Sequence, residues 1–208
     1  MLSGEQFLSF LLAAVVLTAA PGPDNLMVLS IGMTKGKQSG ILFGLGCALG
    51  CLSHTLLAVI GVSALIATST QAFIAFKLCG GLYLAWLGMN TLRHAEPTYV
   101  TTASHDSPTP RRLFLLGVLA NAINPKVILF FLSFLPQFVK PGHGSINAQM
   151  AWLGIIFTAQ AAFIFGLLGY FSGAIGQWLN AHSRLGATMT RLTGVLFIGL
   201  GFRLILNE

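Results

Sequence analysis

The chain has 208 residues, of which 55% are hydrophobic and only 8% are charged. A water-soluble domain carries roughly 25% charged residues, so this composition excludes an ordinary soluble protein and indicates one that lies in a lipid bilayer. The formal net charge of +6 does not predict nucleic-acid binding, because the basic residues lie in connecting loops and form no patch with interleaved aromatic side chains.

Six apolar stretches are long enough to cross a bilayer as helices, which takes about 20 residues each. In chain order they cover residues 7–30, 40–67, 73–92, 113–139, 150–175 and 185–206. No Lys or Arg precedes the first stretch, and Glu5 does. We therefore expect that stretch to remain as a helix and not to be cleaved as a signal peptide. The sequence predicts an all-α membrane protein with six transmembrane helices.

The first and fourth stretches are each interrupted by prolines and polar residues. The interruptions read Pro21-Gly22-Pro23-Asp24-Asn25 and Asn121-Ala122-Ile123-Asn124-Pro125-Lys126, about half a chain length apart. Proline removes a backbone donor and frees a carbonyl, which is tolerated at membrane depth only where protein or a water-filled cavity satisfies it. Paired interruptions in corresponding halves indicate the central binding site of a transporter.

The chain divides into two similar halves. Residues 94–112 are rich in Pro, Ser and Thr and are predicted to form a cytoplasmic linker between an N-terminal three-helix repeat, 1–93, and a C-terminal one, 113–208. Residues 77–85 and 191–199 share a basic residue, leucines, a glycine and an aromatic residue in the same order. Because each half holds three spans, the two repeats are expected to insert with inverted topology, inside one integral membrane domain.

Basic residues in the loops predict how the chain is oriented. One face receives Lys35, Lys37, Arg93, Arg111, Arg112, Arg184 and Arg191, whereas the other receives Lys77, Lys140 and Arg203. Cytoplasmic loops carry the excess of Lys and Arg. The first face is therefore predicted to be cytoplasmic, with both termini outside.

Together, these motifs and their order resemble the LysE/RhtB family of amino-acid exporters. The resemblance rests on residues 21–25, the Gly40-x-x-x-Gly44 helix that follows, and Asn121-x-x-Asn124-Pro125-Lys126 leading into Phe130-Phe131. It implies a multi-pass protein of the bacterial inner membrane that exports amino acids or close derivatives from the cytoplasm, driven by a proton or ion gradient. It implies no cofactor and does not identify the amino acid. A homodimer is an option that the sequence leaves open.

Asp24 and Lys126 are charges at positions where a span would prefer none, and each costs at least about 2.5 to 3.5 kcal/mol to insert. We expect them to converge near the midplane. In one interpretation a zwitterionic substrate competes for both, with its ammonium at Asp24 and its carboxylate at Lys126. In the other they form a buried ion pair that only fixes helix register. Burial favours a protonated carboxylate and a nearby ammonium an ionised one, so Asp24 is also a candidate for proton coupling.

The remaining predicted substrate-site residues flank the two charges. Gly22 permits close approach of the broken backbone, and Pro23 and Pro125 create the two breaks. Asn25 and Asn124 can bond freed carbonyls or the substrate, and we expect Asn121 to have the structural role. In the second span His54 is a second candidate for proton coupling, although a neutral histidine bonded to a neighbouring helix is the commoner arrangement.

Two other functions are open, and both use the second span. A thiol relay could use Cys47, Cys51 and Cys79, but all three lie in the N-terminal half and none is expected near a proline break. A divalent-metal exporter could use Cys51 with His54, although hard cations need several oxygen ligands and Asp24 is the only carboxylate within a span. No triad, paired carboxylates or phosphate loop predicts an enzyme. Glycines along this span predict close helix packing.

Overall fold

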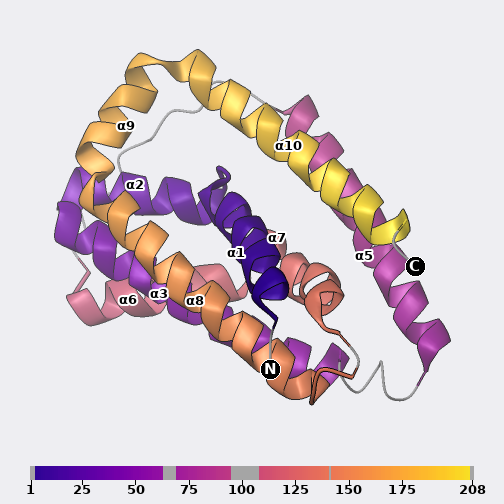
Figure 1. Ribbon diagram of the computed structural model, residues 1–208. Helices are drawn as coiled ribbons and strands as arrows, with labels where there is room; N and C mark the ends of the chain where they lie inside the picture. The colour runs from indigo at the N-terminus through magenta and orange to yellow at the C-terminus, as the bar shows by residue number, and fades with distance from the viewer. Residues whose placement is uncertain (1–2, 63–68, 95–107, 141, 207–208) are drawn as a thin grey trace.

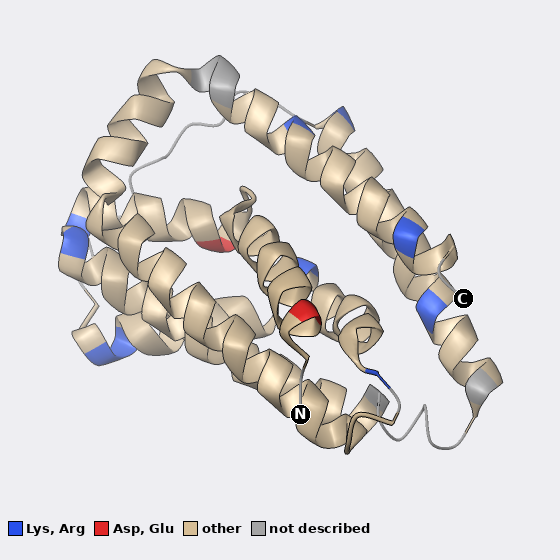
Figure 2. Cartoon of the chain, viewed as in Figure 1, with Lys and Arg blue, Asp and Glu red and all other residues tan. Residues whose placement is uncertain are grey.

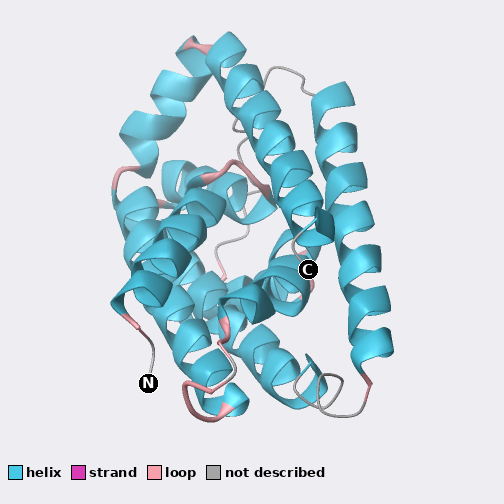
Figure 3. Ribbon diagram, turned by 45° about the vertical axis from the view of Figure 1, so that its right-hand side comes forward, coloured by secondary structure: helices cyan, strands magenta, loops and turns pink. Residues whose placement is uncertain are grey.

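The computed structural model describes residues 3–62, 69–94, 108–140 and 142–206, and these residues form helices without any strand (Figure 3). The elements are α1 (Gly4–Ala19), α2 (Pro23–Lys35), α3 (Lys37–Leu57), the π-helical η1 (Ala58–Val62), α5 (Thr70–Arg93), α6 (Pro110–Ala122), α7 (Pro125–Leu129), the π-helical η2 (Phe130–Phe134), the 3₁₀-helical η3 (Leu135–Phe138), α8 (Ile146–Tyr170), α9 (Ser172–Ala181) and α10 (Ser183–Leu206). Most of the predicted linker, 95–107, lies outside the described residues.

Six spans are present when each broken pair is taken as one. Four helices are individually long and apolar enough to cross a membrane: Lys37–Gly61, Gln71–Arg93, Ile146–Tyr170 and Gly186–Leu206. The other two spans are α1 with α2, bent by 55°, and α6 with Pro125–Phe138, bent by 52°. The prediction of an all-α protein with proline-broken first and fourth helices is confirmed. Its division into halves 1–93 and 113–208 stays a prediction.

The fifth span ends earlier than predicted. The sequence predicts a helix to residue 175, but α8 ends at Tyr170 and α9 begins at Ser172 in a new direction (Figure 1). The Ser172 hydroxyl donates to the Gly169 carbonyl at 2.8 Å and replaces a backbone donor of a continuing helix. The turn allows α9 to pack against α2.

The helices form a central body and a separate pair. In the body α3 packs against α2, α6 and α8, while α5 and α10 lie side by side (Figure 1). Glycines make the α5–α10 contact close: a Cβ at Gly201 would lie 2.6 Å from the Gly81 carbonyl oxygen, and one at Gly194 would lie 2.8 Å from that of Gly88. The predicted packing role of the α3 glycines also holds, since a Cβ at Gly44 would lie 2.9 Å from the Phe165 side chain.

Aromatic side chains fill the body between the two broken spans. Phe130 contacts Phe10, Phe134 and Phe157 with ring centroids 5.2 to 6.1 Å apart. The second half of the fourth span is irregular here, because Pro136 has no N–H to donate to the Leu132 carbonyl, and the helix changes from π to 3₁₀ geometry.

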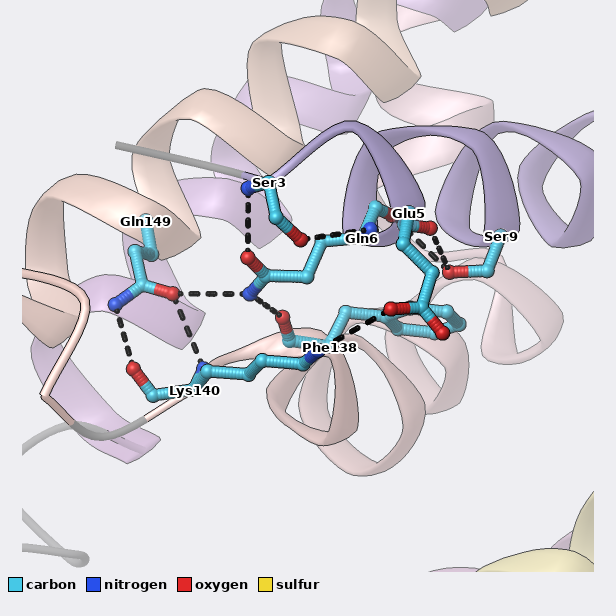
Figure 4. Close-up of polar contacts among 7 residues, drawn as sticks. All are labelled: Ser3, Glu5, Gln6, Ser9, Phe138, Lys140 and Gln149. Atoms are coloured by element: carbon cyan, nitrogen blue, oxygen red, sulfur yellow. Dashed lines mark hydrogen bonds and ion pairs between the residues drawn. The ribbon is translucent and has the colours of Figure 1, made fainter.

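A polar clasp joins three elements at the end of the molecule that carries the N-terminus (Figure 4). Gln6 on α1 donates from Nε2 to the Phe138 carbonyl at 2.8 Å and to Gln149 Oε1 at 3.3 Å. Gln149 on α8 also bonds the Lys140 backbone, donating to its carbonyl at 3.0 Å and accepting from its N–H at 3.1 Å. Gln6 and Gln149 are both buried, so the clasp fixes α1 and α8 to the end of η3.

Candidate functional site

The buried acid of the site lies at the start of α2. Asp24 is 4% exposed, and its Oδ2 accepts a hydrogen bond of 2.7 Å from Asn121 Nδ2 in the last turn of α6. Among the residues that Figure 2 colours by charge, acidic positions are few in comparison with basic ones. A carboxylate in the first turn of a helix is favoured by the helix dipole and by a charge-assisted bond. Both compensate for its burial.

The buried base lies in the other broken span. Lys126 is 8% exposed, and its Nζ donates to the Ala20 carbonyl at 2.7 Å. Ala20 is the C-cap of α1, so the ammonium meets the carbonyl end of a helix, where the dipole favours a cation. The Phe197 ring from α10 lies 6.0 Å from Nζ and adds a cation–π contact.

Asp24 and Lys126 line one cavity but do not form an ion pair in this structure. The salt bridge found among the described residues, Lys140 with Glu5 at 3.7 Å, lies elsewhere at the surface. Each buried charge instead bonds a neutral group of the opposite broken span, Asp24 through Asn121 and Lys126 through Ala20. Two charge-assisted bonds therefore cross the cavity between the broken spans.

The other predicted residues divide into those at the cavity and those outside it. Asn25 and Asn124 line it: Asn25 donates to the Thr18 carbonyl at 3.0 Å, and Asn124 Oδ1 accepts from the Lys126 N–H at 3.0 Å as the cap of α7. Gly22 lines it too, and a Cβ there would lie 3.3 Å from Lys126 Nζ. The structure leaves Pro23 and Pro125 exposed, as the first residues of α2 and α7, so they shape the breaks without lining the cavity.

Asn121 holds the centre of the site, a larger part than the structural role predicted for it. Besides the bond to Asp24, its Oδ1 accepts from Cys51 Sγ at 3.4 Å and its backbone carbonyl lies 3.1 Å from His54 Nε2.

Cys51 lines the cavity, so the expectation that no cysteine lies near a break is wrong. The reason is that α3 packs directly against α6, a contact that sequence spacing does not reveal. Cys47, Cys51 and Cys79 are all free thiols.

Sequence reasoning also missed Thr18 and two aromatic walls. Thr18 lines the cavity, and its hydroxyl accepts from Gln160 Nε2 at 2.8 Å. Phe157 and Phe165 of α8 close another side. Thr18 is a polar residue inside an apolar stretch, which is the signal that could have identified it. The phenylalanines are ordinary apolar residues of a span and carry no such signal.

The cavity is small, with a volume of about 20 Å³. A single water needs about 10 to 15 Å³ on this measure, so the space admits about one water and no amino acid. The buried charges are therefore enclosed in this conformation, and a larger ligand needs the broken spans to separate.

Six apolar spans, two of them broken around an enclosed cavity with a buried acid and a buried base, form an architecture typical of secondary transporters. The chain belongs to the family described as LysE type translocator, whose model matches residues 15–208. With its several apolar spans, it is a multi-pass protein of the bacterial inner membrane.

Several named relatives match over nearly the whole chain. A leucine efflux protein of Enterobacter is 30% identical over 204 residues, covering 95% of this chain and 94% of the relative. A threonine efflux protein of Escherichia coli is 27% identical, covering 97% and 98%. An uncharacterized membrane protein of Pseudomonas aeruginosa is 31% identical, covering 95% and 94%. No solved structure matches the chain.

Proposed function

We propose that this protein exports amino acids or close derivatives from the cytoplasm, and that export is coupled to inward movement of protons. The observation that carries the proposal is the placement of buried Asp24 and Lys126 on two broken spans, around one cavity. An amino acid presents an ammonium and a carboxylate on one carbon, which complement this acid and base. The named efflux proteins among the relatives support the same class of substrate.

Binding would proceed by exchange of partners. The substrate carboxylate binds Lys126 in place of the Ala20 carbonyl. The substrate ammonium binds Asp24 in place of the Asn121 amide. Both exchanges replace a charge–neutral bond by a charge–charge bond, so neither buried charge is left unpaired. The broken spans separate as the two crossing bonds are released, which enlarges the cavity.

Proton coupling is assigned to Asp24, with His54 beside it. Asn121 bridges them, because its amide bonds Asp24 and its backbone carbonyl contacts the His54 ring. A proton that enters from outside neutralises Asp24 and weakens its hold on the substrate ammonium, which favours release. In this proposal His54, whose Nε2 lies 3.1 Å from the Asn121 backbone carbonyl, exchanges that proton with Asp24 during the return step.

The test is counterflow in proteoliposomes loaded with single amino acids, with and without a pH gradient. We expect at least one amino acid to be accumulated against its gradient when a pH gradient is imposed. Asp24→Asn should retain exchange at a lower apparent affinity and lose uphill transport, whereas Lys126→Met should lose both. Lys140→Met, at a half-exposed lysine away from the cavity, is the matched control. If Asp24→Asn keeps full pH-driven transport, Asp24 is not the coupling group.

A second candidate, thiol relay, is favoured by one observation: Cys51 lines the cavity and bonds Asn121. A thiol relay carries reducing equivalents across the membrane. A variant with Cys47, Cys51 and Cys79 all changed to Ser would lose that electron transfer. For the exporter we expect this triple variant to transport amino acids at a rate comparable with the unaltered protein.

A further inference from the structure

A second, apolar cavity adjoins the polar one at the first break. Its volume is about 140 Å³, and its walls come from the end of α1, α2, α8, α9 and the start of α10. Every residue that lines it is apolar except Asn25, and Asn25 also lines the polar cavity. Asn25 therefore lies beside both cavities, one lined largely by polar residues and the other by apolar ones.

One wall of the apolar cavity is buried within the fold, whereas Trp178 and Met189, on another side, are 44% and 41% exposed. Leu29 of α2 and Leu179 of α9 are 3% and 9% exposed and form a small core of their own, with Leu168 packed against it. The turn after Tyr170 creates this wall, because it directs α9 back onto α2. A straight fifth span, as the sequence predicts, would leave no such cavity.

Asn25 is placed to define the boundary between the two spaces. Its Nδ2 donates to the Thr18 carbonyl at 3.0 Å, which fixes the direction of the amide. Within the described parts of the chain its Oδ1 accepts no hydrogen bond, so it is available to a ligand donor. A substrate whose ammonium bound Asp24 and this oxygen could extend its side chain toward Ala19 and Pro21, which line the apolar cavity.

We propose that the apolar cavity receives the side chain of the exported amino acid, so that this protein selects substrates with aliphatic side chains. The inference rests on the proposed function and adds the substrate class. The polar cavity, at about 20 Å³, has no room for a side chain, whereas the apolar cavity has about 140 Å³ and shares Asn25 with it. Moving each methylene from water into an apolar wall stabilises the complex by a constant increment, so affinity should rise with chain length.

The first test measures transport of a linear series: alanine, 2-aminobutyrate, norvaline and norleucine. Apparent affinity should rise about fourfold per added methylene, or about 60-fold over the three steps.

Ala19→Leu fills the cavity and should bring the ratio of norleucine to alanine affinity close to one. Met189→Ala widens it and should shift the preference toward longer chains. Ala75→Leu and Met89→Ala, at exposed positions on α5 outside the cavity, should leave the series unchanged.

The second test reads the cavity directly through Trp178, which lines it. With Trp86→Phe and Trp152→Phe in place, norleucine should shift the Trp178 emission in a saturable way and alanine should shift it less. Because Trp178 is 44% exposed, brominated lipid can quench it from outside the cavity. If norleucine changes neither the Trp178 emission nor this quenching, the cavity does not receive the side chain and the proposal is overturned. Amino-acid transport that is independent of side-chain length overturns it too, while leaving the exporter intact. Transport of no amino acid at all removes both proposals.

Discussion

The hydrogen bond between Asp24 and Asn121 should be worth more than an ordinary bond between membrane helices. It is 2.7 Å long, joins the two broken spans and involves a carboxylate that is 4% exposed. Replacing Asn121 by Leu removes the donor and leaves the carboxylate buried without it. Replacing Asp24 by Leu removes the charge and leaves the amide unpaired. Replacing both removes the interaction and both unpaired groups.

The expected coupling energy follows from the charge state. Hydrogen bonds to charged groups contribute about 1.5 to 3 kcal/mol, whereas neutral bonds between membrane helices average about 0.6 kcal/mol. The double-mutant cycle of Asp24→Leu and Asn121→Leu should therefore give a coupling of about 1.5 to 3 kcal/mol. The bond between Gln160 and Thr18, at 2.8 Å and without a charge, provides the internal reference. Its cycle, Gln160→Leu with Thr18→Val, should give about 0.6 kcal/mol.

The assay is reversible unfolding of each variant in mixed micelles, with no amino acid present. Asp24→Asn, which keeps an acceptor and loses the charge, should lower the coupling with Asn121 to the value of the neutral reference pair. Equal couplings for the charged and the reference pair would refute the reasoning, because they would mean that Asp24 is not held as a carboxylate by Asn121.

Three further predictions concern other contacts. Gln149→Leu removes the bonds that hold the Lys140 backbone and should lower the free energy of unfolding by about 1 to 3 kcal/mol, measured in the same micelles; an unchanged value would show that the clasp carries no stability. Gly201→Val introduces a Cβ against the Gly81 carbonyl and should cost about 1 to 3 kcal/mol, whereas Gly199→Val, where a Cβ meets nothing within 4 Å, should cost less. Gly22→Ala brings a methyl close to Lys126 Nζ and should weaken substrate exchange in counterflow more than it weakens the fold; an equal loss of both would indicate a structural role.

The spans and the breaks could be predicted from sequence because they depend on local properties. Apolar length sets the number of spans, and a proline breaks a helix wherever it lies. The charges at Asp24 and Lys126 were also visible, since a buried charge in a span needs a partner. What the pattern did not contain was the identity of those partners.

The partners are set by packing between distant segments. Ala20 receives Lys126 through a backbone carbonyl, which every residue has, so no sequence signal distinguishes it. Asn121 and Cys51 meet because glycines let α3 approach α6 closely, with the Gly117 Cα 3.1 Å from where a Cβ at Gly46 would lie. The turn after Tyr170 depends on a single serine hydroxyl, whose partner is known only once the helix has formed.

The two bonds that satisfy the buried charges also hold the cavity closed. Each joins a residue of the first span to a residue of the fourth, so these two spans cannot separate without releasing both Asp24 and Lys126 from their partners. Releasing a buried charge into an apolar interior is costly unless a new partner is present. A zwitterion provides both partners at once, whereas an inorganic ion or an uncharged solute provides one or none. Under the proposed function, opening should therefore be easiest when an amino acid is bound, and the empty protein should oppose leakage of protons and ions through the cavity.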